Sequence, residues 1–125
     1  MRTNSLRDRR IAQRQGLWAE RLAAWRLRLA GYRVIARNFR VASGEIDLIV
    51  RRGRLVAFVE VKARPDRTLA AEAIQPFQQA RIRNAAAAFL ARRPDLAGLD
   101  LRFDVVLICP GKLPQHIQDA WRDSG

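Results

Sequence analysis

Two neighbouring segments, residues 44–50 and 58–62, place charged side chains inside otherwise apolar runs. The first carries Asp47, and the second carries Glu60 and Lys62. Residues two apart on a β-strand share a face, so Glu60 and Lys62 point the same way. Two carboxylates beside one lysine suit metal-assisted phosphodiester hydrolysis, because carboxylates bind a hard cation such as Mg²⁺ and lysine stabilises developing negative charge.

The register between the two segments decides whether Asp47 joins this face. If Arg51 pairs with Arg54 across the turn, Asp47 shares the face of Glu60. It then lies opposite Phe58 and diagonal to Glu60, whereas a slip by one residue turns it to the other face. Diagonal neighbours are roughly 7–8 Å apart, so two inward-leaning carboxylates can share a cation. The alternative for a Glu-x-Lys pair alone is a solvated ion pair.

The surrounding pattern predicts the elements that position these residues. A helix is predicted over about residues 14–29 from apolar residues at helical spacing, which are Trp18, Leu22, Trp25 and Leu29. Strands are predicted over residues 32–41, 45–50, 55–63 and 101–109, and a second helix over residues 76–93. The order is helix, three strands, helix, strand, which describes one α/β layer with two helices covering a sheet. Residues 115–121 fit either a helical turn or an edge strand.

Length and composition restrict the class of protein. A chain of 125 residues with 49% hydrophobic and 29% charged residues suits one globular domain, and its longest apolar run, residues 85–91, is too short to span a bilayer. We expect a basic mobile arm over residues 1–13 and a single nuclease-like domain over residues 14–125. The one cysteine, Cys109, cannot form an internal disulfide, which favours the reducing cytoplasm.

The charge balance points to an anionic partner. There are 24 basic and 12 acidic residues, giving a net charge of +12, and nucleic acid is the first candidate for binding such a surplus. Only Lys62 and Lys112 among these basic residues are lysines. Genomic bias toward arginine codons accounts for most of this skew. A lysine retained against the bias, however, fits a site that needs a compact cation with an adjustable pKa.

The motif Gly-Glu-Ile-Asp-Leu-Ile at residues 44–49, followed by Phe-Val-Glu-Val-Lys at residues 58–62, resembles the bacterial YraN family. These proteins are related to archaeal Holliday-junction resolvases within the PD-(D/E)XK nuclease superfamily. The resemblance runs from Gly16 to about Trp121 and includes further positions, which are Glu20, Arg37, Asn38, Arg81, Arg102, Phe103, Asp104 and Val105. It implies a restriction-endonuclease-like α/β core, a mixed β-sheet with the order α-β-β-β-α-β and helices that flank the sheet.

The resemblance also implies a catalytic site. Asp47 and Glu60 would bind Mg²⁺ or Mn²⁺ with help from the Val61 carbonyl, and Lys62 would act on the attacking water. Glu20 would be a further catalytic carboxylate from the first helix. Helical geometry agrees with a functional role for Glu20. No residue three or four positions away is basic, so an ion pair within the helix does not explain this glutamate. The alternative for Glu20 is an ordinary solvated glutamate.

A second group of residues is expected to support the carboxylates or bind phosphate, and it comprises Glu45, Gln78, Arg81, Arg37 and Arg64. Glu45 shares the strand face of Asp47, so it either contributes to the metal site or pairs with Arg64 or another arginine. Gln78 stands where the resemblance would place a lysine. Some branches of the superfamily use glutamine at that position, so the change weakens a phosphate contact more than it removes the chemistry.

Three functions follow in order of preference. The first is a metal-dependent endonuclease that acts on DNA, in particular branched or structured DNA, as a homodimer in the manner of the resolvases. The second is a non-catalytic nucleic-acid-binding protein that retains the nuclease fold. The third is an interaction module for another anionic partner such as ribosomal RNA, which would leave the carboxylates unexplained.

Four other residues have simpler interpretations. Trp18 and Trp25 either stack on unpaired bases or, more commonly for such a stripe, belong to the core or to a dimer face. His116 has no Cys or His at ligand spacing, so we expect it to pack within the tail or to lie on the surface rather than to act in catalysis. Asp104 pairs most simply with Arg102 or another arginine.

Overall fold

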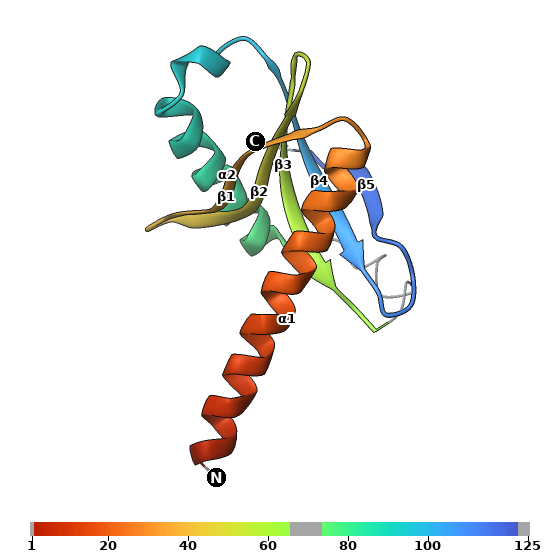
Figure 1. Ribbon diagram of the computed structural model, residues 1–125. Coiled ribbons are helices and arrows are strands. Elements are labelled where there is room, and N and C mark those ends of the chain that lie inside the picture. The colour runs from red at the N-terminus through yellow and green to blue at the C-terminus, as the bar shows by residue number, and fades with distance from the viewer. Residues whose placement is uncertain (1, 66–73, 123–125) are drawn as a thin grey trace.

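The computed structural model describes residues 2–65 and 74–122, with side chains from residue 16 onward. Figure 1 shows helices packed around a single sheet. The elements in chain order are α1 (Arg2–Leu29), β1 (Arg33–Val41), β2 (Gly44–Arg52), β3 (Leu55–Ala63), α2 (Pro76–Ala91), a 3-10 turn η2 (Pro94–Leu96), β4 (Asp100–Ile108) and β5 (Gln115–Trp121). The predicted order of helix, three strands, helix and strand is confirmed, and residues 115–121 form a strand.

The five strands form one mixed sheet in the order β1-β2-β3-β4-β5. β3 and β4 are parallel, with Ala63 paired to Ile108, and the other neighbours are antiparallel. Parallel neighbours need a crossover connection, and α2 lies on the connection between β3 and β4. The expected mixed sheet with flanking helices is therefore confirmed. None of the described helices is long and apolar enough to cross a membrane.

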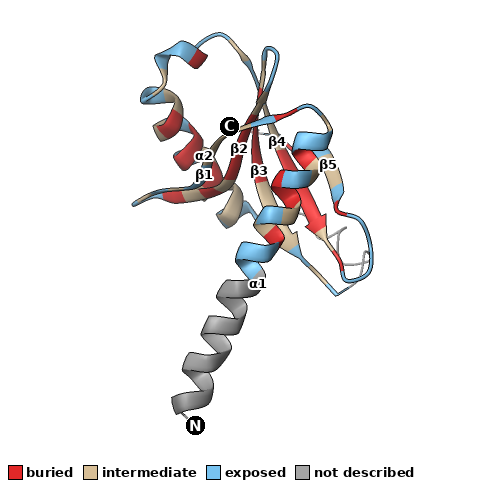
Figure 2. Cartoon of the chain, in the orientation of Figure 1, coloured by how far each residue is buried: buried red, intermediate tan, exposed pale blue. Residues whose placement is uncertain are grey.

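Two hydrophobic clusters lie on opposite faces of the sheet. Alternate residues of β3 divide between them: Phe58 joins the cluster under α2, and Val59 joins the cluster under α1. α1 packs mainly on β3 and β4, and α2 packs on β2 and β1. The central strands are consequently buried on both sides, as Figure 2 shows. Charged residues on β2 and β3 must therefore lie where the sheet opens to solvent.

Helix α1 differs from the prediction in its start and in the face that it buries. Its backbone is helical from Arg2, well before the expected start near residue 14, and whether residues 1–13 form a mobile arm remains a prediction. Its buried face consists of small residues and one leucine, which are Ala19, Ala23, Ala24 and Leu27. Small side chains let a helix lie close to a sheet. Trp18 and Trp25 are 62% and 46% exposed, so their interpretation as core residues is wrong.

The last two strands are joined by a buried polar network around Asp104. This side chain is fully buried and accepts hydrogen bonds from Arg102 at 2.7 Å, from the Asp119 N–H at 3.0 Å and from the His116 ring at 2.8 Å. Burial opposes the charged form of Asp104, but the bonds from His116 and Arg102 prevail and lower its pKa. Asp104 and His116 therefore hold β5 against β4, which confirms the pairing expected with Arg102.

Candidate active site

The two central carboxylates lie where the ladder between β2 and β3 ends. That ladder runs from the pair Arg52–Leu55 to the pair Leu48–Val59 across a two-residue turn. The predicted pairing of Arg51 with Arg54 is wrong, because Gly53 adopts a φ of 60°, which suits the two-residue turn. Extending the observed register places Asp47 directly opposite Glu60. The observed register differs from the predicted one by an even number of residues. Because side chains alternate between the two faces of a strand, Asp47 is still placed on the face of Glu60, as predicted.

Beyond the ladder, side-chain contacts replace strand pairing. The Val61 N–H donates to an Asp47 carboxylate oxygen at 2.8 Å. Gln78 Nε2 on α2 donates to Glu60 Oε1 at 3.2 Å. The ion pairs of the described side chains do not involve Asp47 or Glu60. Two half-buried carboxylates thus lie close together, and no arginine or lysine of the described part of the chain forms an ion pair with either of them.

This arrangement disfavours the charged forms of both groups. Burial and the negative charge of Asp47 raise the pKa of Glu60 from 4.5 to about 8, although the positive charge of Lys62 opposes the rise. Burial also raises the pKa of Asp47, with opposition from the Val61 hydrogen bond and reinforcement from the charge of Glu20. A nearby cation would relieve both effects.

Glu20 reaches the same place from the opposite face of the sheet. It is half-buried on α1, its Oε2 accepts a hydrogen bond from Asn38 Nδ2 at 3.0 Å, and its charge acts on Asp47. The alternation of β2 breaks at this point, because Ile46 packs under α2 whereas Leu48 packs under α1. Asp47 therefore lies where side chains from both faces of the sheet can approach each other. The charges of Glu20 and Glu60 both act on its carboxylate.

Asn38 is a site residue that sequence reasoning noted only as part of a motif. It falls on β1 between the partners of Leu48 and Ile46, which places it opposite Asp47. Its φ of 49° is left-handed, a conformation that asparagine adopts more readily than most residues. An asparagine inside a strand pattern was the available signal. This local bend in β1 accompanies the hydrogen bond to Glu20.

Helix α2 supplies polar partners for both glutamates of the two strands. Besides the contact of Gln78 with Glu60, Arg81 binds Glu45 through Nη2 at 2.6 Å and Nε at 3.0 Å. The hydrogen bond from Arg81 lowers the pKa of Glu45. Of the alternatives for Glu45, the structure therefore shows pairing with an arginine, and the partner is Arg81 rather than Arg64. This pair ties α2 to the start of β2.

The remaining predicted arginines lie at the margin. Arg37 is exposed on β1, and Arg64 donates to the carbonyl oxygen of its neighbour Ala63 at 2.9 Å. Arg40 was missed: its charge lowers the pKa of Asp47 and of Glu45. With Glu20 and Asn38 it lines a hollow of about 450 Å³. Its position on β1, two residues after Asn38, was the only signal.

The oxygen atoms at this point suit a hard divalent cation. Among the described residues, no three His, Cys, Asp or Glu side chains are placed to hold a metal together. Asp47 and Glu60 alone provide carboxylate oxygens, and the Val61 carbonyl follows directly in the chain. Mg²⁺ is commonly bound by one or two carboxylates plus water and substrate phosphate, and the donors here are of that kind.

Comparison with known proteins assigns the family. The sequence model described as "Uncharacterised protein family UPF0102" matches residues 19–108, which is well over half of the chain. The chain belongs to this family, the YraN family. A YraN-family protein of Paramagnetospirillum magneticum is 61% identical over 80 residues, covering 64% of this chain and 62% of that protein. The predicted resemblance is therefore confirmed.

Two longer matches extend over nearly the whole chain. A family member from Methylorubrum extorquens is 51% identical over 117 residues, covering 94% of this chain and 91% of that protein. One from Maricaulis maris is 48% identical over 115 residues, covering 92% and 91%. Both are described only as UPF0102 proteins, so YraN-family membership brings no activity with it.

Proposed function

We propose that this YraN-family protein is a divalent-metal-dependent endonuclease that hydrolyses DNA phosphodiester bonds with water as the nucleophile. The observation that carries this proposal is the pair of interacting carboxylates, Asp47 and Glu60, which are half-buried and outside the ion pairs of the described residues. The order of strands and helices is compatible with the restriction-endonuclease-like core that the resemblance implies.

Asp47, Glu60 and the Val61 carbonyl would hold Mg²⁺ or Mn²⁺. Such an ion supplies Lewis-acid polarisation of a phosphoryl oxygen and lowers the pKa of an attacking water. The donor set agrees with this choice, because hard cations prefer oxygen ligands. Burial and the negative charge of Asp47 raise the pKa of Glu60 to about 8, and a bound cation would favour the charged form against both.

Other residues of the chain would orient the attacking water, stabilise the developing charge and hold Glu60 in place. Lys62 lies two residues after Glu60 on the same strand, and its ammonium can donate to the attacking water or to a phosphoryl oxygen as negative charge develops. Glu20 carries an acceptor held by Asn38 and can orient the same water. Gln78 holds Glu60 from α2. Water attacks phosphorus directly and releases a proton to the solvent, while the bond to the leaving oxygen breaks and that oxygen takes up a proton from the solvent. No covalent enzyme intermediate is needed.

The substrate class follows from charge and from the resemblance. A net charge of +12 favours a polyphosphate. On β1, the charge of Arg40 acts on Asp47, and Arg37 is exposed on the same strand, where both can contact the DNA backbone. The relation to resolvases makes branched or structured DNA the expected form and a homodimer the expected assembly. The free, buried Cys109 fits a reducing compartment such as the cytoplasm.

Cleavage of a substrate panel tests the proposal. Single-stranded, duplex, flap and four-way-junction DNA are incubated with Mg²⁺ and with wild type, Glu60→Gln or Asp95→Asn. Asp95 lies in η2, before the start of β4 and away from the carboxylates, so Asp95→Asn matches the charge change outside the site. Cleavage by wild type and Asp95→Asn but not by Glu60→Gln supports the proposal. Equal cleavage by all three proteins contradicts it.

Gln78 favours the second candidate function, a nucleic-acid-binding protein without cleavage. In the position where a lysine is expected, its amide binds Glu60 and brings no positive charge to a phosphate. Under this alternative, wild type binds DNA with a steep salt dependence but leaves every substrate of the panel intact. Gln78→Lys then distinguishes the two, because restored cleavage would assign the missing activity to this substitution.

A further inference from the structure

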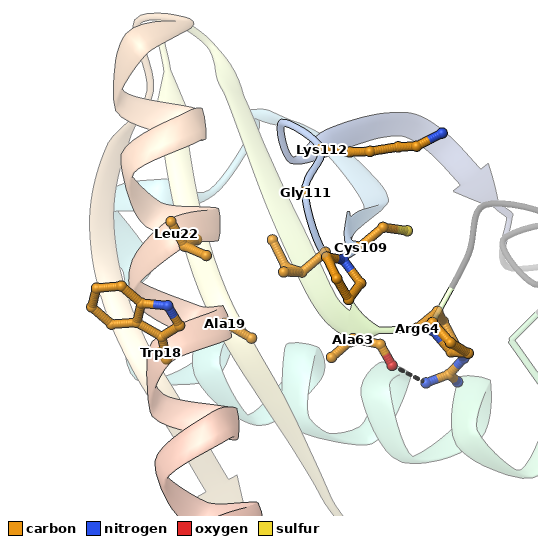
Figure 3. A pocket seen from close by; sticks show the side chains of 11 residues that line it. Trp18, Ala19, Leu22, Ala63, Arg64, Cys109, Gly111 and Lys112 are labelled. Atoms are coloured by element: carbon orange, nitrogen blue, oxygen red, sulfur yellow. Dashed lines mark hydrogen bonds between the residues drawn. The ribbon is translucent and has the colours of Figure 1, made fainter.

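A second cavity of about 500 Å³ lies between α1 and the carboxyl ends of β3 and β4. Figure 3 shows Ala19 on the side of α1 toward Ala63 and Cys109, with Trp18 and Leu22 on the neighbouring sides of the helix. The lining combines apolar and cationic side chains, chiefly Trp18, Leu22, Ala63, Arg64, Cys109 and Lys112, and none of the lining residues in ranges 16–65 and 74–122 is acidic. The volume falls within the usual range for small-ligand pockets.

The cavity adjoins the carboxylate site along β3. Ala63 and Arg64 directly follow Lys62, and a strand rises about 3.3 Å per residue, so Ala63 lies about 10 Å from Glu60 along the strand. The two sites use opposite faces of β3, because Glu60 contacts α2 whereas Ala63 faces α1 across the cavity. A polymer that passes the end of β3 can reach both.

The chemistry of the lining selects one kind of occupant. Trp18 is 62% exposed and offers an indole ring beside apolar walls, as a stacking base requires. Arg64 and Lys112 offer positive charge at the same cavity, which favours a phosphate. A base within a duplex is already stacked and paired on its edge, so it cannot enter without being extruded.

We propose that this cavity binds one unpaired nucleotide of a nucleic-acid strand, with the base against Trp18 and its phosphate near Arg64 and Lys112. The inference rests on the proposed function, because the occupant is part of the same DNA that reaches Glu60. It assigns the substrate class more narrowly as DNA with an unpaired segment beside the scissile bond. The proposal gives the two exposed tryptophans of α1 different roles, because Trp18 lines the cavity and Trp25 does not.

Binding without metal tests this proposal separately from cleavage. A fluorescently labelled oligothymidine and a labelled blunt duplex are titrated in EDTA, with anisotropy as the readout. Trp18→Ala should weaken oligothymidine binding by about tenfold and leave duplex binding unchanged, because one base–aromatic stack is lost. Trp18→Phe should retain most of the affinity. Trp25→Ala is the matched control on the same helix and should bind both probes like wild type.

Three results would overturn the proposal: an unchanged oligothymidine affinity for Trp18→Ala, an equal loss for the duplex, or an equal loss for Trp25→Ala. A change from dimer to monomer in Trp18→Ala, measured by sedimentation, would instead assign the cavity to a second copy of this chain. The proposed nuclease function is judged independently by duplex binding and by cleavage that depends on Glu60. If those persist while Trp18→Ala has no effect, only the nucleotide cavity is wrong.

Discussion

Replacing Glu60 by glutamine should stabilise the metal-free protein at alkaline pH. The carboxyl group of Glu60 faces Asp47 and has a pKa raised to about 8, so ionising it in the folded state costs free energy. Glutamine keeps a similar shape, never ionises and still offers an oxygen to Gln78. The substitution therefore removes the repulsion and leaves most of the packing in place.

The raised pKa of Glu60 determines the pH range in which stability changes and the size of that change. Because the folded-state pKa of Glu60 lies above its ordinary value of 4.5, the folded state holds a proton that the unfolded chain has released between pH 4.5 and about 8. The free energy of unfolding should fall as pH rises through this window and stay level above it with respect to this group. At about 1.4 kcal/mol per unit, the loss is up to about 5 kcal/mol.

Urea denaturation in EDTA at pH 5 and pH 8.5 measures this effect. Wild type and Asp95→Asn should lose free energy of unfolding between the two pH values, and Glu60→Gln should lose a few kcal/mol less. Comparing variants cancels the contributions of other titrating groups. If Glu60→Gln has the same pH dependence as wild type, or is less stable than wild type at pH 8.5, the reasoning about facing carboxylates is refuted.

Three further substitutions have expected outcomes. Asp104→Asn should lower the free energy of unfolding by about 3 kcal/mol in urea melts, because it breaks the ion pair between fully buried Asp104 and Arg102. Wild type should lose this contribution only as pH falls below about 3.8, since the pKa of Asp104 is lowered. Gly44→Ala should lower the melting temperature, because a Cβ there would collide with the Arg81 carbonyl. Arg40→Ala should weaken DNA binding at all sequences and reduce the salt slope by about one.

The order of elements and the central carboxylate pair could be predicted from the sequence. Strand periodicity alone placed Glu60 and Lys62 on one face, and an even error in register kept Asp47 on that face. The fold needed only local patterns because β1, β2 and β3 follow one another through short turns, and α2 is the crossover that a parallel neighbour requires.

Features that depend on contacts between distant elements could not be predicted. The buried face of α1 is its alanine face, because close packing on β3 and β4 favours small residues over the larger tryptophans. The role of Asn38 depends on a left-handed residue on β1 meeting Glu20 of α1, and no local pattern specifies that meeting. The partner of Glu45 likewise required the position of α2, because many arginines were available.

Calorimetric titration of the purified protein with Mn²⁺ at pH 8 tests the central claim most directly. The claim is that Asp47 and Glu60 together form a divalent-cation site. It predicts one saturable site per chain in wild type and in Asp95→Asn, and loss of that site in Asp47→Asn and in Glu60→Gln. Absence of binding by wild type, or unchanged affinity in Asp47→Asn, would contradict the claim.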